Sequence, residues 1–143
     1  MNTAQPRHSV SVSGVIPDDH GRVLLIRRRD NQHWEPPGGV LELNETIQDG
    51  LRREIREETG LDIEPGPLTG VYKNMPRGII ALVFRCKITG GHLTANDEVT
   101  AFHWADEADI RQLTSEAYAV RLLDALRPDA APAVRQHDGH NVL

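Results

Sequence analysis

The sequence predicts an α+β fold in which a mixed or antiparallel β-sheet lies between helices. Short segments that alternate polar and apolar side chains predict half-buried strands, and one long amphipathic segment predicts a helix. Strands and helices do not alternate regularly, as a parallel βαβ sheet would require. With 143 residues, 38% of them hydrophobic, the chain suits one domain, residues 1–143, whose core is expected at about 8–127.

The first elements are expected to be two strands and a loop. Residues 9–16 alternate polar and apolar side chains, which predicts a half-buried strand. Asp and Gly residues at 17–21 favour a turn, and residues 22–28 predict a second strand, so the two strands should form a hairpin. The segment 29–39 is rich in Asn, Pro and Gly and is expected to be a loop, followed by a short extended piece at 40–43.

Residues 45–59 give the strongest helix signal in the chain. Asn44 stands where a side chain can cap the first turn, and Gly60 stands where a left-handed residue ends a helix. Gly50 lies inside this segment, where glycine costs about 1 kcal/mol of helix stability relative to alanine. The sequence therefore predicts a helix that begins and ends sharply and is weakened at one position.

The second half of the chain is expected to return to strands and then helices. Residues 61–72 are extended but contain Pro65 and Pro67, which predicts an interrupted strand at a sheet edge. From position 128 onward little can be buried, so residues 128–143 are expected to form a flexible C-terminal tail. The remaining predicted elements are strands at 79–88 and 98–104 and helices at 107–113 and 115–126.

Composition excludes several classes of partner. Sixteen basic and 21 acidic side chains leave a net charge of −5, which argues against stable binding to duplex nucleic acid. No apolar run approaches the roughly 20 residues that a membrane-spanning helix needs, so no membrane association is expected. Cys86 is the only cysteine and has no partner for an internal disulfide, which favours a reducing compartment such as the cytoplasm.

Three carboxylates share one face at the end of the predicted helix. Glu54, Glu57 and Glu58 are spaced by three and four residues, and they repel one another where the helix dipole prefers cations. Leu51 and Ile55 lie beside them, so the acids border the buried face. Two interpretations follow from these residues: a solvated acidic helix held by salt bridges, or a divalent-metal site. Hard oxygen ligands of this kind suit Mg²⁺ or Mn²⁺.

The loop before the helix extends this acidic pattern. Gly38 and Gly39 let the backbone approach a ligand closely, and Glu42 and Glu45 add two carboxylates near the helix N-terminus. At every defined position the segment resembles the Nudix box, with the spacing Gly39, five residues, Glu45, seven residues, Arg53-Glu54-Ile55, one residue, Glu57-Glu58, one residue, Gly60-Leu61.

The resemblance implies a fold, an activity and roles for particular residues. Nudix proteins are α/β/α sandwiches that use Mg²⁺ or Mn²⁺ to hydrolyse nucleoside diphosphates linked to another group, X. Carried over by position, Glu57 and Glu58 are expected metal ligands, Glu54 is a ligand or the base, and Arg53 positions the catalytic glutamates. The resemblance further implies that the Gly38 carbonyl is a ligand, that Gly39 belongs to the site, and that Glu45 is a supporting carboxylate.

Outside the box each candidate has two interpretations. Several family members place a further acidic ligand or base where Glu98 stands, although a surface glutamate beside Asp97 explains it equally. Arg28 ends a strand in a run of three arginines and is expected either to bind phosphate or to be a solvated strand end. Trp34 is expected to stack on a base or to anchor its loop in the core.

The resemblance leaves the substrate class open. Some members that cleave ADP-ribose carry a proline about 15 residues beyond the box, where Pro76 stands, whereas WEPPGG at 34–39 resembles members that act on nucleoside triphosphates. A nucleoside triphosphate or its oxidised form is slightly favoured over ADP-ribose. The alternative is a catalytically weak module that senses a nucleotide. Homodimers are common in the family, although no segment of this chain predicts an interface.

Overall fold

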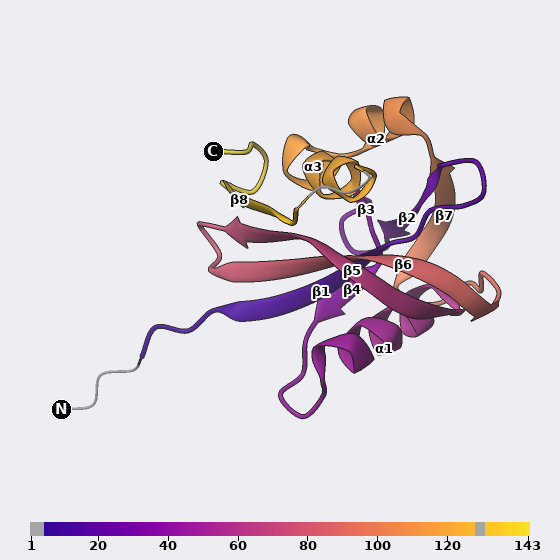
Figure 1. Cartoon of the computed structure of the whole chain (residues 1–143), viewed down its shortest axis with the longest axis horizontal. Coiled ribbons are helices and arrows are strands. Elements are labelled where there is room, and N and C mark those ends of the chain that lie inside the picture. The colour runs from indigo at the N-terminus through magenta and orange to yellow at the C-terminus, as the bar shows by residue number, and fades with distance from the viewer. Residues whose placement is uncertain (1–4, 128–130) are drawn as a thin grey trace.

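The computed structural model describes residues 5–127 and 131–143 and contains two β-sheets and three helices (Figure 1). The five-stranded sheet has the order β4 (Gly38–Val40), β1 (Ser9–Val15), β6 (Ile79–Gly91), β5 (Leu61–Asn74), β8 (Ala133–His137). The three-stranded sheet has the order β3 (Trp34–Glu35), β2 (Val23–Arg28), β7 (Val99–Ala105). The helices are α1 (Ile47–Thr59), α2 (Glu107–Leu113) and α3 (Glu116–Ala125).

The helices cover opposite faces of the larger sheet. Figure 1 shows α1 on one side and α2 and α3 on the other. One buried cluster packs residues such as Tyr72 and Leu122 between the sheet and α3, and a second packs Val12 and Ile55 against α1. Because β1 pairs parallel with β6 while β5 pairs antiparallel with it, the sheet is mixed. The predicted α/β/α sandwich is confirmed.

The predicted hairpin between the first two strands is wrong. The chain does reverse at Asp18, but β1 pairs with β4 and β6, whereas β2 pairs with β3 and β7. The two strands meet only at the turn, where the Leu24 amide donates to the Ile16 carbonyl at 3.1 Å. A local turn signal therefore identified the reversal but not the sheet that each strand joins.

The strand at 61–72, which was expected to be interrupted, is instead part of a continuous 14-residue strand, β5. Its register against β6 shifts around Pro65 and Leu68, so the prolines are accommodated by bulges. On its other side β8 pairs only with Gly70–Asn74. The edge prediction is correct for the proline-containing half, which β8 does not reach, and wrong for the second half.

The flexible tail expected at 128–143 is wrong for residues 131–143, while residues 128–130 lie outside the described part of the chain. Strand β8 pairs parallel with β5, and His137 is buried. The Arg135 guanidinium donates to both carboxylate oxygens of Asp124 at 2.8 Å, and the Tyr72 hydroxyl donates to the same carboxylate at 2.8 Å. These bonds join strand β8 to α3 and β5, and none of them is visible in the local sequence.

Helix α1 and its N-cap each begin two residues later than expected. Thr46, not Asn44, is the N-cap, and its hydroxyl accepts from the Asp49 amide at 3.1 Å. Gly60 ends the helix with φ of 81°, as predicted. A Cβ at Gly50 would lie 2.5 Å from Leu41 Cδ1 and 2.8 Å from Glu45 Oε1. Glycine at position 50 therefore allows the preceding loop to pack on the helix.

No helix in residues 5–127 or 131–143 is both long enough and apolar enough to cross a membrane.

Candidate active site

The three carboxylates at the end of α1 lie at three different depths. Glu58 is 4% exposed, the Glu54 side chain is 14% exposed, and the Glu57 side chain is 53% exposed. This gradient follows from the helical spacing, because the acids border the face that carries Leu51 and Ile55 into the core. The depth of Glu54 and Glu58 disagrees with a merely solvated acidic helix.

Arg53 holds the acidic side chains in place. Its Nε and one NH₂ group donate to the two carboxylate oxygens of Glu45 at 2.8 and 2.7 Å. Its other NH₂ group donates to Glu54 at 3.0 Å and to Glu57 at 3.3 Å. The hydrogen bond from Arg53 lowers the pKa of Glu45 to about 2. One guanidinium thus orients two acids of the helix and is itself fixed by a third.

Glu58 is the most buried of the three acids, and its side chain connects helix α1 to the loop that carries Gly38. Its Oε1 accepts a hydrogen bond from the Gly38 amide at 2.7 Å. Burial raises the pKa of Glu58 to about 8, and the negative charges of Glu54 and Glu98 add to this effect. A carboxylate in this position is costly to ionise unless a cation lies beside it.

The glycine loop, formed by Gly38 and Gly39, lies directly against the face of α1 that carries the acids. A Cβ at Gly39 would collide with the carboxyl group of Glu54. Any larger residue would therefore displace either the loop or the carboxylate. Because the Gly38 amide already contacts Glu58, the two glycines and the two acids form one continuous surface.

The donor set fits a hard divalent cation, although the acids are not yet gathered around one point. Within the described residues, no three His, Cys, Asp or Glu side chains form a cluster that holds an ion as it stands. Glu54 and Glu57 are instead turned towards Arg53. Their oxygens, with the buried Glu58 carboxyl, supply the ligand type that Mg²⁺ and Mn²⁺ prefer.

Asn96 connects the end of α1 to the loop that carries Glu98. Its side-chain NH₂ donates to the Glu58 carbonyl at 2.7 Å, and its Oδ1 accepts from the amides of Glu98 and Val99 at 2.9 and 3.0 Å. Sequence reasoning missed this residue. An asparagine before a strand signals a local turn, but the bond to Glu58 spans 38 positions of the chain and has no local signal.

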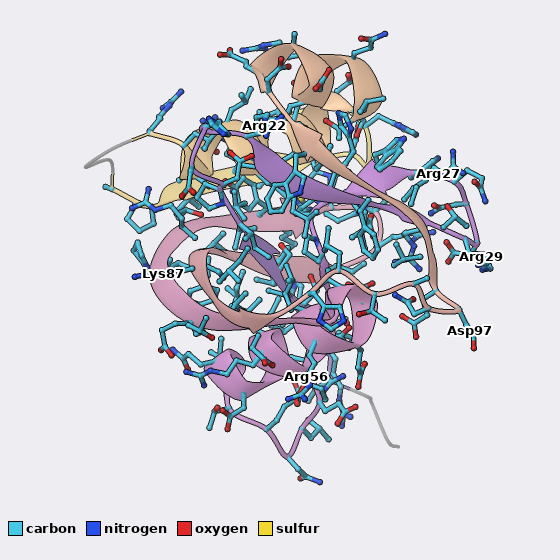
Figure 2. All side chains as sticks on the ribbon, turned by 90° about the vertical axis from the view of Figure 1, so that its right-hand side faces the viewer. Arg22, Arg27, Arg29, Arg56, Lys87 and Asp97 are labelled. Carbon is cyan, nitrogen blue, oxygen red and sulfur yellow. The ribbon has the colours of Figure 1, made fainter. Side chains whose placement is uncertain are left out.

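Glu98 faces the same cavity as Glu58. This first cavity, about 320 Å³, is lined by Arg28, Arg29, Asp30, Glu58, Asp97 and Glu98. The Arg29 side chain donates to the Asp97 carbonyl at 2.8 Å, and Figure 2 shows these two residues together at one end of the molecule. The position of Glu98 suits the role of an added acidic ligand or base, and that role stays a prediction.

Arg28 separates the first cavity from a second one of about 270 Å³, because it lines both. Its guanidinium donates to Asp30 at 2.9 and 2.7 Å and to Glu35 at 3.2 Å. Burial raises the pKa of Glu35, and the Arg28 charge opposes this shift. Arg28 can contact a ligand in either cavity, and its phosphate-binding role stays a prediction.

Trp34 lies away from both cavities. Its ring packs edge-to-face on His103 with centroids 6.0 Å apart, and the Arg27 guanidinium lies 5.8 Å from the ring centroid. It also packs against the buried cluster between the larger sheet and α3. This position favours the interpretation of Trp34 as an anchor in the core, and its stacking on a base stays a prediction.

The family model of the NUDIX domain matches residues 7–126. A MutT-like protein of Streptomyces ambofaciens is 53% identical over 141 residues, which cover 99% of this chain and 91% of that protein. An ADP-ribose pyrophosphatase of Methanocaldococcus jannaschii is 37% identical over 73% of this chain and 66% of its own length. A solved ADP-ribose pyrophosphatase from Streptococcus suis superposes with a TM-score of 0.76 at 21% identity, covering 92% of this chain and all of that one.

Proposed function

The chain belongs to the Nudix family and is a Nudix hydrolase, and we propose that it uses Mg²⁺ or Mn²⁺ to hydrolyse a diphosphate bond in a nucleoside diphosphate linked to X. The favoured substrate is a nucleoside triphosphate or its oxidised form, and ADP-ribose is second. The observation that carries the proposal is the Arg53 clamp, which holds Glu54 and Glu57 beside the buried Glu58.

A bound Mg²⁺ or Mn²⁺ would neutralise phosphate oxygens and make water a better nucleophile. Glu57, Glu58 and the Gly38 carbonyl would hold the ion, with Glu98 as a further ligand. Glu54 is either another ligand or the base that takes a proton from the attacking water. As the water oxygen bonds to phosphorus, the bond from phosphorus to the bridging oxygen breaks, and the departing phosphate keeps the electron pair.

Arg53 and Glu45 position these groups and need not touch the substrate. Arg53 donates to one oxygen of Glu54 and leaves the other, Oε2, without a bond to Arg53. Glu45 fixes the guanidinium from behind with two hydrogen bonds. A carboxylate that is held in place accelerates the reaction more than a mobile one, because it does not have to reorient when the water attacks.

The choice of X rests on the sequence and the relatives. The segment 34–39 supports a nucleoside triphosphate, and Glu35 and Gly38 within it line the second cavity. Pro76 lies between Asn74 and Arg77, which line the same cavity, and the Methanocaldococcus relative is named an ADP-ribose pyrophosphatase. The second cavity is therefore where we expect the two substrate classes to be distinguished.

A phosphate-release screen of the purified protein tests the proposal. The panel holds nucleoside triphosphates, oxidised nucleotides, ADP-ribose, dinucleoside polyphosphates and nucleotide sugars, each with Mg²⁺ or Mn²⁺ and with coupling enzymes that reveal the products. Metal-dependent cleavage of one class well above the rest is the expected result. Binding without cleavage across the panel, in both metals, would contradict it and support the alternative of a nucleotide-sensing module.

We also propose a cytoplasmic location and leave a homodimer as a prediction. The single cysteine, Cys86, is buried, and burial raises its pKa to about 12, which is consistent with a thiol that takes no part in chemistry.

Size-exclusion chromatography with light scattering measures the mass in solution and decides between monomer and dimer.

A further inference from the structure

Two buried polar groups that lack partners lie in the same cavity. Among residues 5–127 and 131–143, Ser13 Oγ and Arg121 Nε are the two buried side-chain polar atoms without a hydrogen-bond partner. Both residues line the second cavity, beside Gly38 and Gly39. Buried polar groups in folded proteins are nearly always satisfied, because an unpaired one costs about 1–3 kcal/mol. Their coincidence in one cavity points to a polar ligand.

Arg121 is a buried positive charge that forms no salt bridge in the described part of the chain. It is 7% exposed, and its guanidinium lies 4.6 Å from the Tyr118 ring centroid and 5.4 Å from that of Tyr72. Its one hydrogen bond joins an NH₂ group to His137 Nε2 at 3.1 Å. Asp124 on the same helix is already bound by Arg135 and Tyr72, and Glu35, which lines the same cavity, acts on the Arg121 charge without a salt bridge.

The second cavity leads from the glycine loop of the box to helix α3. Ser13 on β1 lies opposite Gly38 on β4, and Arg121 projects from α3. A substrate whose phosphates lie at the Glu58 side of the loop would therefore place its other end at Arg121. Three arginines and one glutamate line this cavity, so donors of hydrogen bonds outnumber acceptors: Arg28, Arg77, Arg121 and Glu35.

We propose that Arg121, assisted by Ser13, recognises the carbonyl oxygen of a nucleobase that carries an oxo group next to a ring N–H. This specificity role rests on the proposed function. Arg121 can only donate, whereas Glu35 in its ionised form accepts, so the pair matches a ring that presents a carbonyl beside an N–H. A ring with an amino group at the same place would direct a donor at Arg121 and leave its charge unpaired.

The surroundings of Arg121 favour a planar ring over a second phosphate. The second cavity is also lined by Tyr118, Val12 and Ile79, which offer flat or apolar surface. Phosphate sites surround the anion with several free donors, whereas in this cavity the Arg28 guanidinium is already bonded to Asp30 and Glu35. Apolar walls with a few placed polar groups are typical of base recognition. The Arg121 guanidinium already lies over the Tyr118 ring, which fixes its position in the cavity wall.

The test compares nucleotides that differ only at the recognised edge. Inosine and adenosine triphosphates differ at purine C6 and N1, and uridine and cytidine triphosphates differ at the equivalent pyrimidine positions. We expect kcat/KM of the wild type to favour the oxo member of each pair by about 10- to 100-fold, as for a hydrogen bond to a charged group. Arg121→Met should bring each ratio close to one by lowering the oxo member alone.

Several outcomes would overturn the inference. An equal loss for all four nucleotides would mean that Arg121 binds phosphate or supports the fold, and no loss would mean that it does not meet the base. A wild type that prefers the amino member, or adenine-containing ADP-ribose, would also overturn it. Isothermal titration of inosine and adenosine monophosphates reports base preference without turnover. A preference there in a protein that cleaves nothing would reject the proposed function and keep the inference.

Ser13→Ala is a second test variant, needed because Arg121→Met removes a buried side chain and could lose activity by unfolding. Because Ser13 Oγ has no partner in the free protein, its removal should leave the thermal unfolding midpoint unchanged or higher. We expect the preference for the oxo nucleotide to fall several-fold all the same. Arg111→Met is the matched control for Arg121→Met, since Arg111 is an exposed arginine on α2 paired with Glu107, and it should change neither ratio.

Discussion

The two ends of the proposed substrate site, the acids of the box and Arg121 in the second cavity, carry opposite charge, and Gly38 joins them because it bonds to Glu58 and lines that cavity. At the acidic end, in the box, Glu54 and Glu58 are largely buried; Arg53 donates to Glu54, the Gly38 amide donates to Glu58, and burial raises the pKa of both acids. At α3, Arg121 is a buried cation that forms no salt bridge among the described residues. One end therefore needs a cation and the other an acceptor. A nucleotide bound through a divalent metal would supply both at once.

The largest loss of activity should come from removing a carboxylate at the acidic end. Glu57→Gln removes one charge from the proposed metal site but keeps the size of an exposed side chain. We expect kcat to fall by about 1000-fold, since a metal ion supplies several kcal/mol of charge stabilisation and each 1.36 kcal/mol is tenfold in rate. Steady-state kinetics in Mg²⁺ measure the loss. The control is Glu107→Gln on α2, and undiminished turnover in Glu57→Gln would reject the ligand assignment.

The second prediction concerns the buried pair behind Arg121. Arg135→Met leaves the Asp124 carboxylate buried with only the Tyr72 hydroxyl, and we expect it to lower the free energy of unfolding at pH 7 by about 3 kcal/mol. Denaturant unfolding measures this change. Little change would mean that β8 contributes little to the fold, and Arg22→Met, at an exposed pair with Asp18, is the control.

The same variant has a defined pH dependence. Burial alone would raise the pKa of Asp124, but hydrogen bonds from Arg135 and Tyr72 outweigh burial and hold it below its usual value. A carboxylate with a depressed pKa stabilises the fold above its unfolded pKa of about 3.9, and this contribution is lost as the pH falls through the folded pKa. The difference between wild type and Arg135→Met should therefore shrink below about pH 4.

How far the sequence predicts each end follows from the range of its contacts. The box residues lie within 23 positions, so spacing alone identifies Arg53, Glu54, Glu57 and Glu58 and places the acids at the border of the core. The other end combines β1, α3 and β8, whose residues are far apart in the chain. Arg121 and β8 could not be predicted, because an arginine in a helix and a short polar segment gain meaning only from distant partners.

Asn96 offers a smaller and more selective test of the acidic end. Asn96→Ala removes the bond to the Glu58 carbonyl and the two bonds that shape the loop of Glu98. We expect the Mg²⁺ concentration for half-maximal rate to rise about tenfold, as for groups that orient metal ligands, with a much smaller effect on saturated kcat. A merely structural role would instead lower the unfolding midpoint at unchanged Mg²⁺ dependence. Asn141→Ala, at an exposed position, is the control.

Gly50→Ala, the change with the smallest expected effect, tests whether helix propensity or packing decides the stability of α1 near the acids. By propensity alone, Gly50→Ala should stabilise α1 by about 1 kcal/mol. The new Cβ would, however, lie 2.5 Å from Leu41 Cδ1 and 2.8 Å from Glu45 Oε1, and overpacking of this kind costs about 1–3 kcal/mol. We expect a net loss of about 1 kcal/mol in denaturant unfolding. Activity should also fall, because displaced Glu45 would release Arg53, the residue that holds Glu54 and Glu57. A stabilised and fully active variant would show that the loop moves away at little cost and that the clamp does not depend on Glu45.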